Sequence, residues 1–162
     1  LFLQSLNAAS WLIGLIVSVQ AFLEVPMMML APYLLTRLSM RLLILIGAVV
    51  MPIRWLLYAF IREPLWILPT QLLNGVSVVS FFVVAVAFVD QLVEPQWRAT
   101  GQGLFSSAMM GVGSGVGIYL AGLVLELFEV QRIWLFSFFL GMIGLGLLLY
   151  SFRRNSYEPG GE

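Results

Sequence analysis

The amino-acid sequence predicts an all-α bundle of transmembrane helices, with five complete spans and the end of one more. Of its 162 residues, 61% are hydrophobic and only 10% are charged, and the mean hydropathy is +1.01. A soluble domain contains about 45–50% apolar and about 25% charged residues. A soluble fold of this size would also leave roughly a third of its surface exposed to water. We therefore expect a lipid bilayer to cover much of this chain.

Five apolar segments are long enough to cross a bilayer, which requires about 20 residues in a helix. The connections between them are short, so consecutive helices should pack antiparallel. Residues 1–6 are too short to span, and residues 7–10 are expected to form a turn. The five complete spans are expected over residues 10–33, 41–61, 65–89, 101–127 and 133–152.

The distribution of arginine predicts the orientation of the bundle. Longer loops are expected near residues 34–40 and 90–100, on the same side as the C-terminus. Cytoplasmic loops are enriched in basic residues, so the side with more arginines should face the cytoplasm. The bundle is expected over residues 1–154, followed by a disordered cytoplasmic tail over 155–162. The loop side has Arg37, Arg41, Arg98, Arg153 and Arg154, whereas the opposite side has Arg62 and Arg132.

The composition excludes several kinds of chemistry. The chain contains neither Cys nor His, which removes disulfides, thiol chemistry and the usual zinc sites. Ser–His and Cys–His catalysis are excluded for the same reason. We expect no metal, no cofactor, no catalytic residue and no enzymatic activity. Eight acidic residues balance eight basic ones, so no basic surface for nucleic acid is expected.

Two charged residues are expected in the middle of membrane spans. Glu24 lies within the first complete span and Arg54 within the second. A charge at the centre of a bilayer costs about 2.5–3.5 kcal/mol even on the milder insertion scales. Both side chains should therefore face the protein interior or a hydrated cavity. They could line the path of a solute, or they could form a structural ion pair that holds two helices together.

Three amides are expected near these charges. Gln20 precedes Glu24 by four residues and therefore shares its helix face. Gln71 and Asn74 lie three residues apart on the third span. They could contribute to the same solute path, or they could form ordinary hydrogen bonds between helices.

Prolines are expected to interrupt three spans. Pro26, Pro52 and Pro69 each lie two residues from a polar side chain of the proposed path. Each proline removes a backbone donor and frees the carbonyl oxygen of an earlier residue. Kinks beside polar residues are typical of helices that line a cavity.

Glycines recur along the fourth span, and a charged cluster is expected at the cytoplasmic ends of the spans. The spacing of the glycines gives two overlapping GxxxG pairs, which allow close helix packing. A phosphate-binding loop is excluded by the depth and by the lack of Lys. The charged residues are expected in cytoplasmic loops, where they could contribute to gating. The glycines are Gly111, Gly113, Gly115 and Gly117, and the cluster comprises Arg37, Arg41, Asp90 and Arg98.

The order of these motifs resembles the C-terminal half of the major facilitator superfamily. The resemblance is to the branch that contains lactose permease, nucleoside–proton symporters and phenylpropionate permease-like proteins, and it covers the whole chain except the tail. The stretches concerned are Glu24-Val-Pro, Ala31-Pro32, Arg37 with Arg41, Pro52-Ile-Arg54, Gln71-Leu-Leu-Asn74-Gly75 and Arg98-Ala-Thr-Gly-Gln-Gly.

This resemblance implies that residues 1–6 end helix seven and that the five spans are helices eight to twelve. The chain begins without Met, so we expect it to start within a larger protein and to lack an N-terminal six-helix half. The resemblance implies a secondary transporter that moves a small polar organic solute across the bacterial cytoplasmic membrane by alternating access. A non-transporting membrane sensor or scaffold is the alternative, and it predicts Glu24 and Arg54 sealed against each other without a cavity.

The resemblance also implies roles for individual residues. Arg54 matches a helix-nine Arg that takes part in proton coupling, and Glu24 lies near the position of a sugar-binding Glu. The positions of the family's His and Glu proton relay are occupied here by Asn74 and Ser77, neither of which exchanges a proton near neutral pH. The coupling ion is therefore left open, with Glu24 as a candidate proton carrier.

Overall fold

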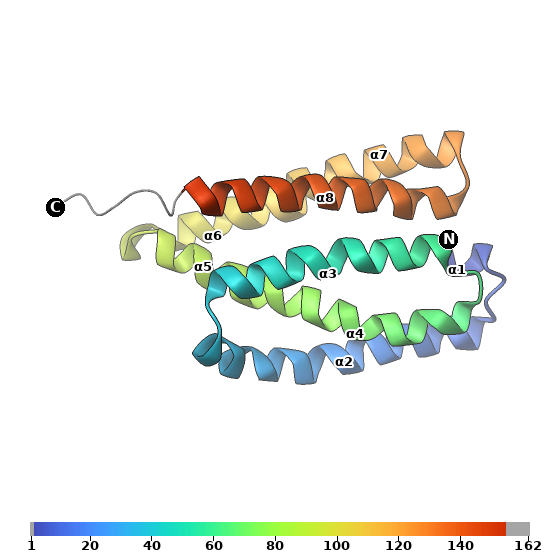
Figure 1. Cartoon of the computed structure of the whole chain (residues 1–162), viewed down its shortest axis with the longest axis horizontal. Helices are drawn as coiled ribbons and strands as arrows, with labels where there is room; N and C mark the ends of the chain where they lie inside the picture. The colour runs from blue at the N-terminus through green and yellow to red at the C-terminus, as the bar shows by residue number, and fades with distance from the viewer. Residues whose placement is uncertain (1, 155–162) are drawn as a thin grey trace.

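The protein is a bundle of long helices that run side by side (Figure 1). A computed structural model describes residues 2–154, and the expected tail over residues 155–162 lies outside the described residues. Five helical segments are long and apolar enough to cross a membrane, which confirms the expected fold class. The elements are α1 (Phe2–Ser5), α2 (Ser10–Arg37), α3 (Met40–Phe60), η1 (Pro64–Trp66), α4 (Ile67–Val78), η2 (Val79–Val84), α5 (Ala85–Leu92), η3 (Pro95–Trp97), α6 (Arg98–Ser106), η4 (Ser107–Gly113), α7 (Ser114–Leu127) and α8 (Val130–Arg154).

The third and fourth spans are composite helices. The third consists of η1, α4, η2 and α5, and the fourth consists of η3, α6, η4 and α7. Within them, η1 and η3 are 3₁₀ turns, whereas η2 and η4 are π-helical. A π-helical segment inside an α-helix is rare and frequently marks a functional site.

The loops are shorter than expected. The first span remains helical through Arg37, and the next helix begins at Met40 after Ser39 caps it by accepting a hydrogen bond from the Leu42 amide at 3.3 Å. The loop expected near residues 34–40 is therefore only residues 38–39, and most of the one expected near 90–100 is helical, since α5 continues to Leu92 and α6 begins at Arg98. The spans predicted from the sequence end at the first polar residues. A helix continues further because it satisfies its own backbone groups near the bilayer surface.

The bundle has two distinct ends. Figure 1 shows α1 at the same end as the turns from α3 to η1 and from α7 to α8. We call this the α1 end. The opposite end contains the turn from α2 to α3, the turn from α5 to η3 and the C-terminal end of α8, and we call it the Arg37 end. At the α1 end, Asn7 adopts φ 54° in the turn before α2, a left-handed conformation that Asn tolerates better than most residues.

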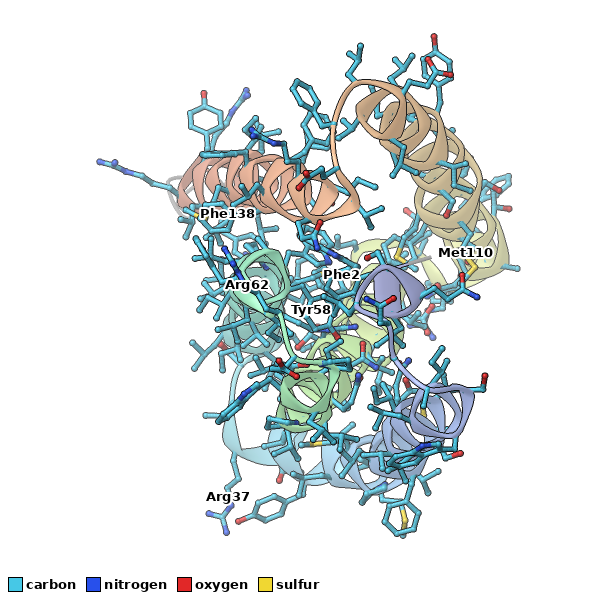
Figure 2. The ribbon with its side chains drawn as sticks, turned by 90° about the vertical axis from the view of Figure 1, so that its right-hand side faces the viewer. Phe2, Arg37, Tyr58, Arg62, Met110 and Phe138 are labelled. Carbon is cyan, nitrogen blue, oxygen red and sulfur yellow. The ribbon has the colours of Figure 1, made fainter. Side chains whose placement is uncertain are left out.

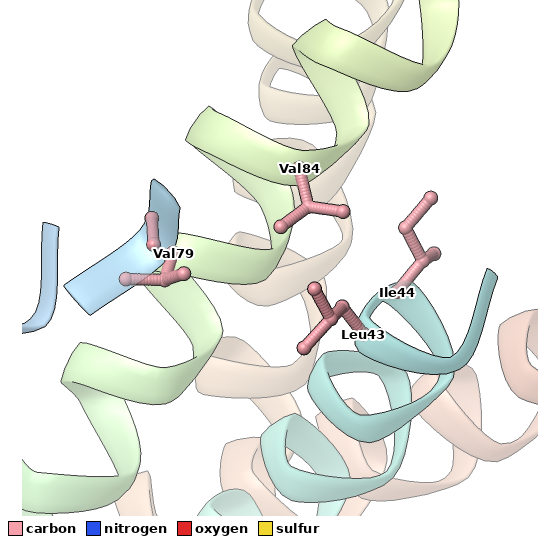
Figure 3. Close-up of a cluster of buried hydrophobic side chains, with 5 residues drawn as sticks. Leu43, Ile44, Val79 and Val84 are labelled. Carbon is pink, nitrogen blue, oxygen red and sulfur yellow. The ribbon is translucent and has the colours of Figure 1, made fainter. Parts of the chain in front are cut away.

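A small apolar core joins α2, α3 and the third span. Its buried residues are Leu43 and Ile44 of α3, Val79 and Val84 of η2, and Ala31 of α2. Figure 3 shows Leu43 and Ile44 facing the π-helical segment that contains Val79 and Val84. In α7 and α8, by contrast, no described residue is buried. Their exposed apolar side chains suit contact with lipid or with another helical unit.

Close packing in the bundle depends on three glycines. A Cβ at Gly47 of α3 would overlap Ser80 of η2, whose hydroxyl donates to the Leu43 carbonyl at 3.0 Å. A Cβ at Gly75 of α4 would lie 2.8 Å from Met27 Cγ of α2. A Cβ at Gly141 of α8 would lie 2.7 Å from a ring carbon of Pro52. These positions bring α3, α4 and α8 against their neighbours, and the sequence analysis did not identify them.

One of the three prolines occupies a different position from that expected. Pro26 lies inside α2 and Pro52 inside α3. Pro69, however, lies in the first turn of α4, which begins at Ile67. The first turn of a helix has no intrahelical acceptors for its amides, so a proline costs little there. The expected interruption of the third span at Pro69 is therefore wrong.

Adding a methyl group at the packed glycines should destabilise the bundle. We expect Gly47→Ala or Gly141→Ala to lower the stability of the purified protein by about 1–3 kcal/mol, because overpacking forces backbone or side-chain shifts. Thermal unfolding in detergent measures the effect. Gly146→Ala is the matched control on α8, since nothing lies within 4 Å of a Cβ at that position. Equal melting of all three variants would contradict the assigned packing.

Candidate functional site

Asn74 joins Glu24 and Arg54 in the middle of the bundle. Its amide nitrogen donates to Glu24 Oε1 at 2.8 Å, and its amide oxygen accepts from Arg54 Nη1. Glu24 and Arg54 thus share a partner, and a neutral amide separates the two charges. The amide is oriented with its donor towards the carboxylate and its acceptor towards the guanidinium. This orientation stabilises both ions without direct contact between them.

The network extends by one residue at each end. Gln20 donates to Glu24 Oε1 at 3.2 Å, and Arg54 Nε donates to the Tyr58 hydroxyl at 3.1 Å. The Arg54 guanidinium also lies over the Tyr58 ring, 5.2 Å from its centroid, a favourable cation–π distance. We call these five residues the Asn74 network. Among the described residues, none donates a hydrogen bond to the second oxygen of Glu24, Oε2.

Helical spacing and one glycine explain this arrangement. Gln20 and Glu24 are four residues apart on α2, as are Arg54 and Tyr58 on α3, so each pair shares a helix face. Helix α4 packs against both α2 and α3. The residue after Asn74 is Gly75, which allows α4 to approach α2 closely. Asn74 can therefore reach both charged side chains.

A pocket of about 410 Å³ lies beside the network and includes Asn74 itself. Its polar groups are the Asn74 amide and the hydroxyls of Ser77 and Ser114. Both π-helical segments contribute to its wall, with Phe81 from η2 and Met110 from η4. No charged side chain is among its lining residues. A small uncharged molecule with hydroxyl or amide groups would suit it, because such pockets combine apolar walls with a few polar groups.

Gln71 and Ser77 lie outside the Asn74 network. Gln71 is only 2% exposed, and it lines a separate cavity at the α1 end together with Gln20 and Tyr58. The Ser77 hydroxyl donates to the Leu73 carbonyl of its own helix at 3.1 Å. Of the five residues predicted to form a solute path, Glu24, Arg54, Gln20 and Asn74 therefore come together, and Gln71 lies to one side.

The four charged residues predicted for gating lie on helices rather than in loops. Arg37 ends α2, Arg41 lies in the first turn of α3, and Arg98 begins α6. Their guanidinium groups contact aromatic rings in two cases, Arg37 over Tyr33 and Arg41 over Phe152. Asp90 of α5 accepts a hydrogen bond from Gln102 at 2.8 Å, and Gln102 also donates to the Val86 carbonyl at 2.7 Å. The expected loop location is wrong, and a gating role stays a prediction.

The predicted packing of the fourth-span glycines stays a prediction as well. Within the described chain, nothing lies within 4 Å of a Cβ built at Gly111, Gly115 or Gly117. At Gly113 the nearest atom is the Ala108 carbonyl oxygen of the same span, at 3.2 Å. These glycines therefore have no neighbouring helix against them in residues 2–154.

Two functional candidates were missed in the sequence analysis. Tyr58 follows Arg54 by four residues, so its position on the same helix face was a usable signal. Gln102 had no such signal, because its contacts with Asp90 and Val86 cross the turn between the third and fourth spans.

The bundle and its buried polar network define an integral membrane protein with a polar site between its spans. The family profile described as "MFS_1 like family" matches residues 1–136. The chain therefore belongs to this family, within the major facilitator superfamily, as its motifs predicted.

The chain is similar to three bacterial membrane proteins. It is 28% identical to the xanthosine permease of Escherichia coli (strain K12) over 161 residues, which cover 90% of this chain and 37% of that protein. It is 29% identical to the maltose permease of Geobacillus stearothermophilus over 143 residues, covering 88% and 36%. It is 26% identical to the uncharacterized transporter YwbF of Bacillus subtilis (strain 168) over 151 residues, covering 93% and 38%. The chain thus spans less than two fifths of these relatives' length. No solved structure gives a significant match.

Removing the central amide should destabilise the protein strongly. We expect Asn74→Leu to lower the stability by about 1–3 kcal/mol or more, because it leaves a carboxylate and a guanidinium without their shared partner. In a double-mutant cycle, Asn74→Leu and Glu24→Gln should couple by about 0.5–3 kcal/mol, as residues in one network do. Thermal unfolding measures both effects.

Ser77→Ala is the control for this prediction. Ser77 is buried on the same helix, one turn from Asn74, but its hydroxyl bonds only to its own backbone. Its loss should change the stability little. A similar loss for Ser77→Ala and Asn74→Leu, with additive effects in the cycle, would contradict the bridging role of Asn74.

Proposed function

We propose that this chain is the C-terminal part of a secondary transporter that moves a small, uncharged polar organic solute by alternating access. The observation that supports this proposal best is the Asn74 network in mid-membrane with a pocket beside it. Ionisable groups within membrane spans are costly and typically mark solute or proton pathways. Substrate sites of such transporters lie near the bilayer midplane, between two helical units that rock against each other.

Glu24 is the proposed proton carrier. It is the acidic member of the Asn74 network, and no described residue donates to its second oxygen, which could therefore take a proton or accept a hydrogen bond from a solute hydroxyl. Protonation would remove the negative charge to which Asn74 and Gln20 donate. The network would then lose the attraction that aligns α2 with α4. A change in the relative stability of two helix arrangements is what coupling between a proton and a solute requires.

The charge balance of the site favours an uncharged solute. Glu24 and Arg54 compensate each other through Asn74, and the neighbouring pocket presents only neutral polar groups. A charged solute would enter that pocket without a partner of opposite charge, which is unfavourable away from water. Two of the similar proteins are named for xanthosine and maltose, a nucleoside and a disaccharide. Both are therefore suitable test solutes.

The proposal includes a partner and an orientation. An N-terminal six-helix half of the same protein would complete the path, since the similar proteins are more than twice as long as this chain. It would also cover the fourth span, where nothing in residues 2–154 lies within 4 Å of a Cβ built at Gly111, Gly115 or Gly117. The Arg37 end is proposed to face the cytoplasm of a bacterial cell, because it carries Arg37, Arg41, Arg98, Arg153 and Arg154.

The alternative of a non-transporting sensor or scaffold receives less support. It requires Glu24 and Arg54 to be sealed against each other without a cavity. Here Asn74 separates the two side chains and also lines a pocket of about 410 Å³. This arrangement favours a site that accommodates a solute over a purely structural ion pair.

Neutralising Glu24 should abolish proton-driven uptake. In liposomes containing the whole protein, we expect an inward proton gradient to stimulate uptake of radiolabelled xanthosine or maltose. Glu24→Gln should reduce this stimulation at least tenfold, because the amide cannot exchange a proton. Exchange of solute at equal concentrations should persist, since an amide can still form hydrogen bonds at this position.

The matched control is Glu63→Gln. Glu63 is exposed in the turn between α3 and η1, so its neutralisation should leave uptake unchanged. If Glu24→Gln retained both the rate and the pH dependence of uptake, its proposed role would be wrong. If the whole protein took up no solute but bound a partner protein, the scaffold alternative would be favoured.

A further inference from the structure

A long apolar cavity lies between α3, α8, α6 and the third span. It has a volume of about 380 Å³, and all the residues that line it are apolar. Helix α8 packs against α3 along this cavity, and Figure 2 shows the two helices beside each other, with Phe138 marking α8. Met51 and Phe81 line both this cavity and the pocket beside Asn74. A cavity without polar groups stays dry, so its walls suit a hydrocarbon chain rather than a polar solute.

The cavity extends over about the depth of one leaflet of a bilayer. Its lining residues on α3 run from Ile44 to Trp55, and those on α8 run from Gly141 to Phe152. Each stretch covers eleven residue steps, which is about 16 Å of helix. Half of a hydrocarbon core is about 15 Å. A Cβ at Gly141 would lie 2.7 Å from Pro52 and 3.0 Å from Trp55, so the two helices meet where the cavity ends near the middle of the bundle.

The cavity is open rather than sealed. Of the residues that line it, only Ile44, Pro52 and Ala85 are buried, and Gly144 of α8 is exposed. Nothing in residues 2–154 lies within 4 Å of a Cβ built at Gly144. Hydrocarbon is the solvent around the spans of a membrane protein. An acyl chain can therefore enter along α8.

Arg41 lies at the outer end of the cavity, at the Arg37 end of the bundle. It precedes Ile44 by three residues and Ala48 by seven, so it shares the face of α3 that lines the cavity. Its guanidinium lies over the Phe152 ring, 5.7 Å from the centroid, and that ring is part of the cavity wall. Arg41 is exposed, and no carboxylate in residues 2–154 pairs with it. A cation without a counter-ion thus stands above the apolar space.

The charges near this outer end are mainly positive. Arg153 and Arg154 come directly after Phe152 on α8, and both are exposed. Asp90 follows Val89 of the cavity wall, but its carboxylate accepts a hydrogen bond from Gln102. Basic sites between membrane helices bind the anionic headgroups of lipids. The excess of arginine here therefore favours an anionic headgroup.

We propose that this cavity binds one acyl chain of an anionic phospholipid whose phosphate contacts Arg41. The chain would fill the space between α3 and α8 as far as Gly141, and the headgroup would lie at the Arg37 end. Hydrocarbon gains little when it moves from a bilayer to an apolar protein surface, so the contact with Arg41 provides the selectivity. The site is separate from the solute path, and it does not depend on the transport function that we propose.

Phosphatidylglycerol is the probe, and phosphatidylcholine with identical acyl chains is its matched analogue. Native mass spectrometry of the complete, delipidated protein measures the dissociation constant of each lipid. We expect phosphatidylglycerol to bind roughly fivefold more tightly, which is the effect of about one arginine on an anionic lipid. The choline of the analogue already balances its phosphate. Inorganic phosphate at millimolar concentration should not displace the lipid, because it has no acyl chain to fill the cavity.

Replacing Arg41 tests the contact with the headgroup. Arg41→Gln should abolish the roughly fivefold preference for phosphatidylglycerol, because the amide carries no charge. Arg37→Gln is the matched control. Arg37 is also exposed over an aromatic ring, that of Tyr33 at 5.6 Å, but Figure 2 shows it on the opposite side of the bundle from α8. This control should retain the preference.

Filling the cavity tests the place of the acyl chain. Gly144→Leu puts a side chain into open space on the cavity wall, so the variant should fold and bind phosphatidylglycerol several-fold more weakly. Gly146→Leu is the matched control, because Gly146 is equally exposed on α8 but does not line the cavity. It should bind the lipid as the unmodified protein does.

Four results would overturn the proposal. Equal binding of the two lipids would remove the role of the negative charge. Unchanged binding by Arg41→Gln and Gly144→Leu would place the lipid elsewhere. Displacement by inorganic phosphate would indicate an anion site without an acyl chain. A complete protein that binds neither lipid would have this cavity covered by another part of its polypeptide. None of these results bears on the proton-driven uptake test, which addresses Glu24.

Discussion

The two hydrogen bonds of Asn74 allow a carboxylate and a guanidinium, those of Glu24 and Arg54, to lie in the middle of this bundle. Lipid provides no partner for Glu24 or Arg54, so each must find one on another helix. Asn74 provides both, because a single amide can donate to the carboxylate and accept from the guanidinium. The Asn74 side chain therefore links α2, α3 and α4 directly. The apolar packing around Asn74 brings these three helices close enough for both hydrogen bonds to form.

This arrangement differs from a direct ion pair in the strength of the attraction between its two charges. Two charges in direct contact in a region of low dielectric attract each other strongly and separate with difficulty. An intervening amide weakens that attraction while satisfying the hydrogen-bonding groups of both ions. Under the function that we propose, protonation of Glu24 or contact with a solute would alter the network. The pocket beside Asn74 and the cavity beside Gln20 and Tyr58 both adjoin it.

Some helices of the bundle are closely packed, whereas others bury none of their residues. The helices α2 and α3 and the third span are joined by a buried core and by glycines that fit against Ser80 and Met27. The helix α7 buries none of its residues, and among the described residues nothing lies within 4 Å of a Cβ built at Gly111, Gly115 or Gly117. Small residues on a membrane helix allow another helix to approach closely. This surface suits the six-helix half that we propose to complete the protein.

The sequence by itself determined the fold class, the number of helices long enough to span a membrane, and the placement of Glu24 and Arg54 within the first two of them. Apolar runs of spanning length leave a helix as the only structure that satisfies the backbone in lipid, so these features follow from local composition. The sequence also indicated Gln20, since a spacing of four residues fixes a shared face. Only the tertiary structure decided that Asn74 stands between the charges, that Gln71 belongs to another cavity, and that Gly47, Gly75 and Gly141 are the packed glycines. Those facts depend on which faces of different helices meet, and contacts between residues far apart in the chain have no local signal.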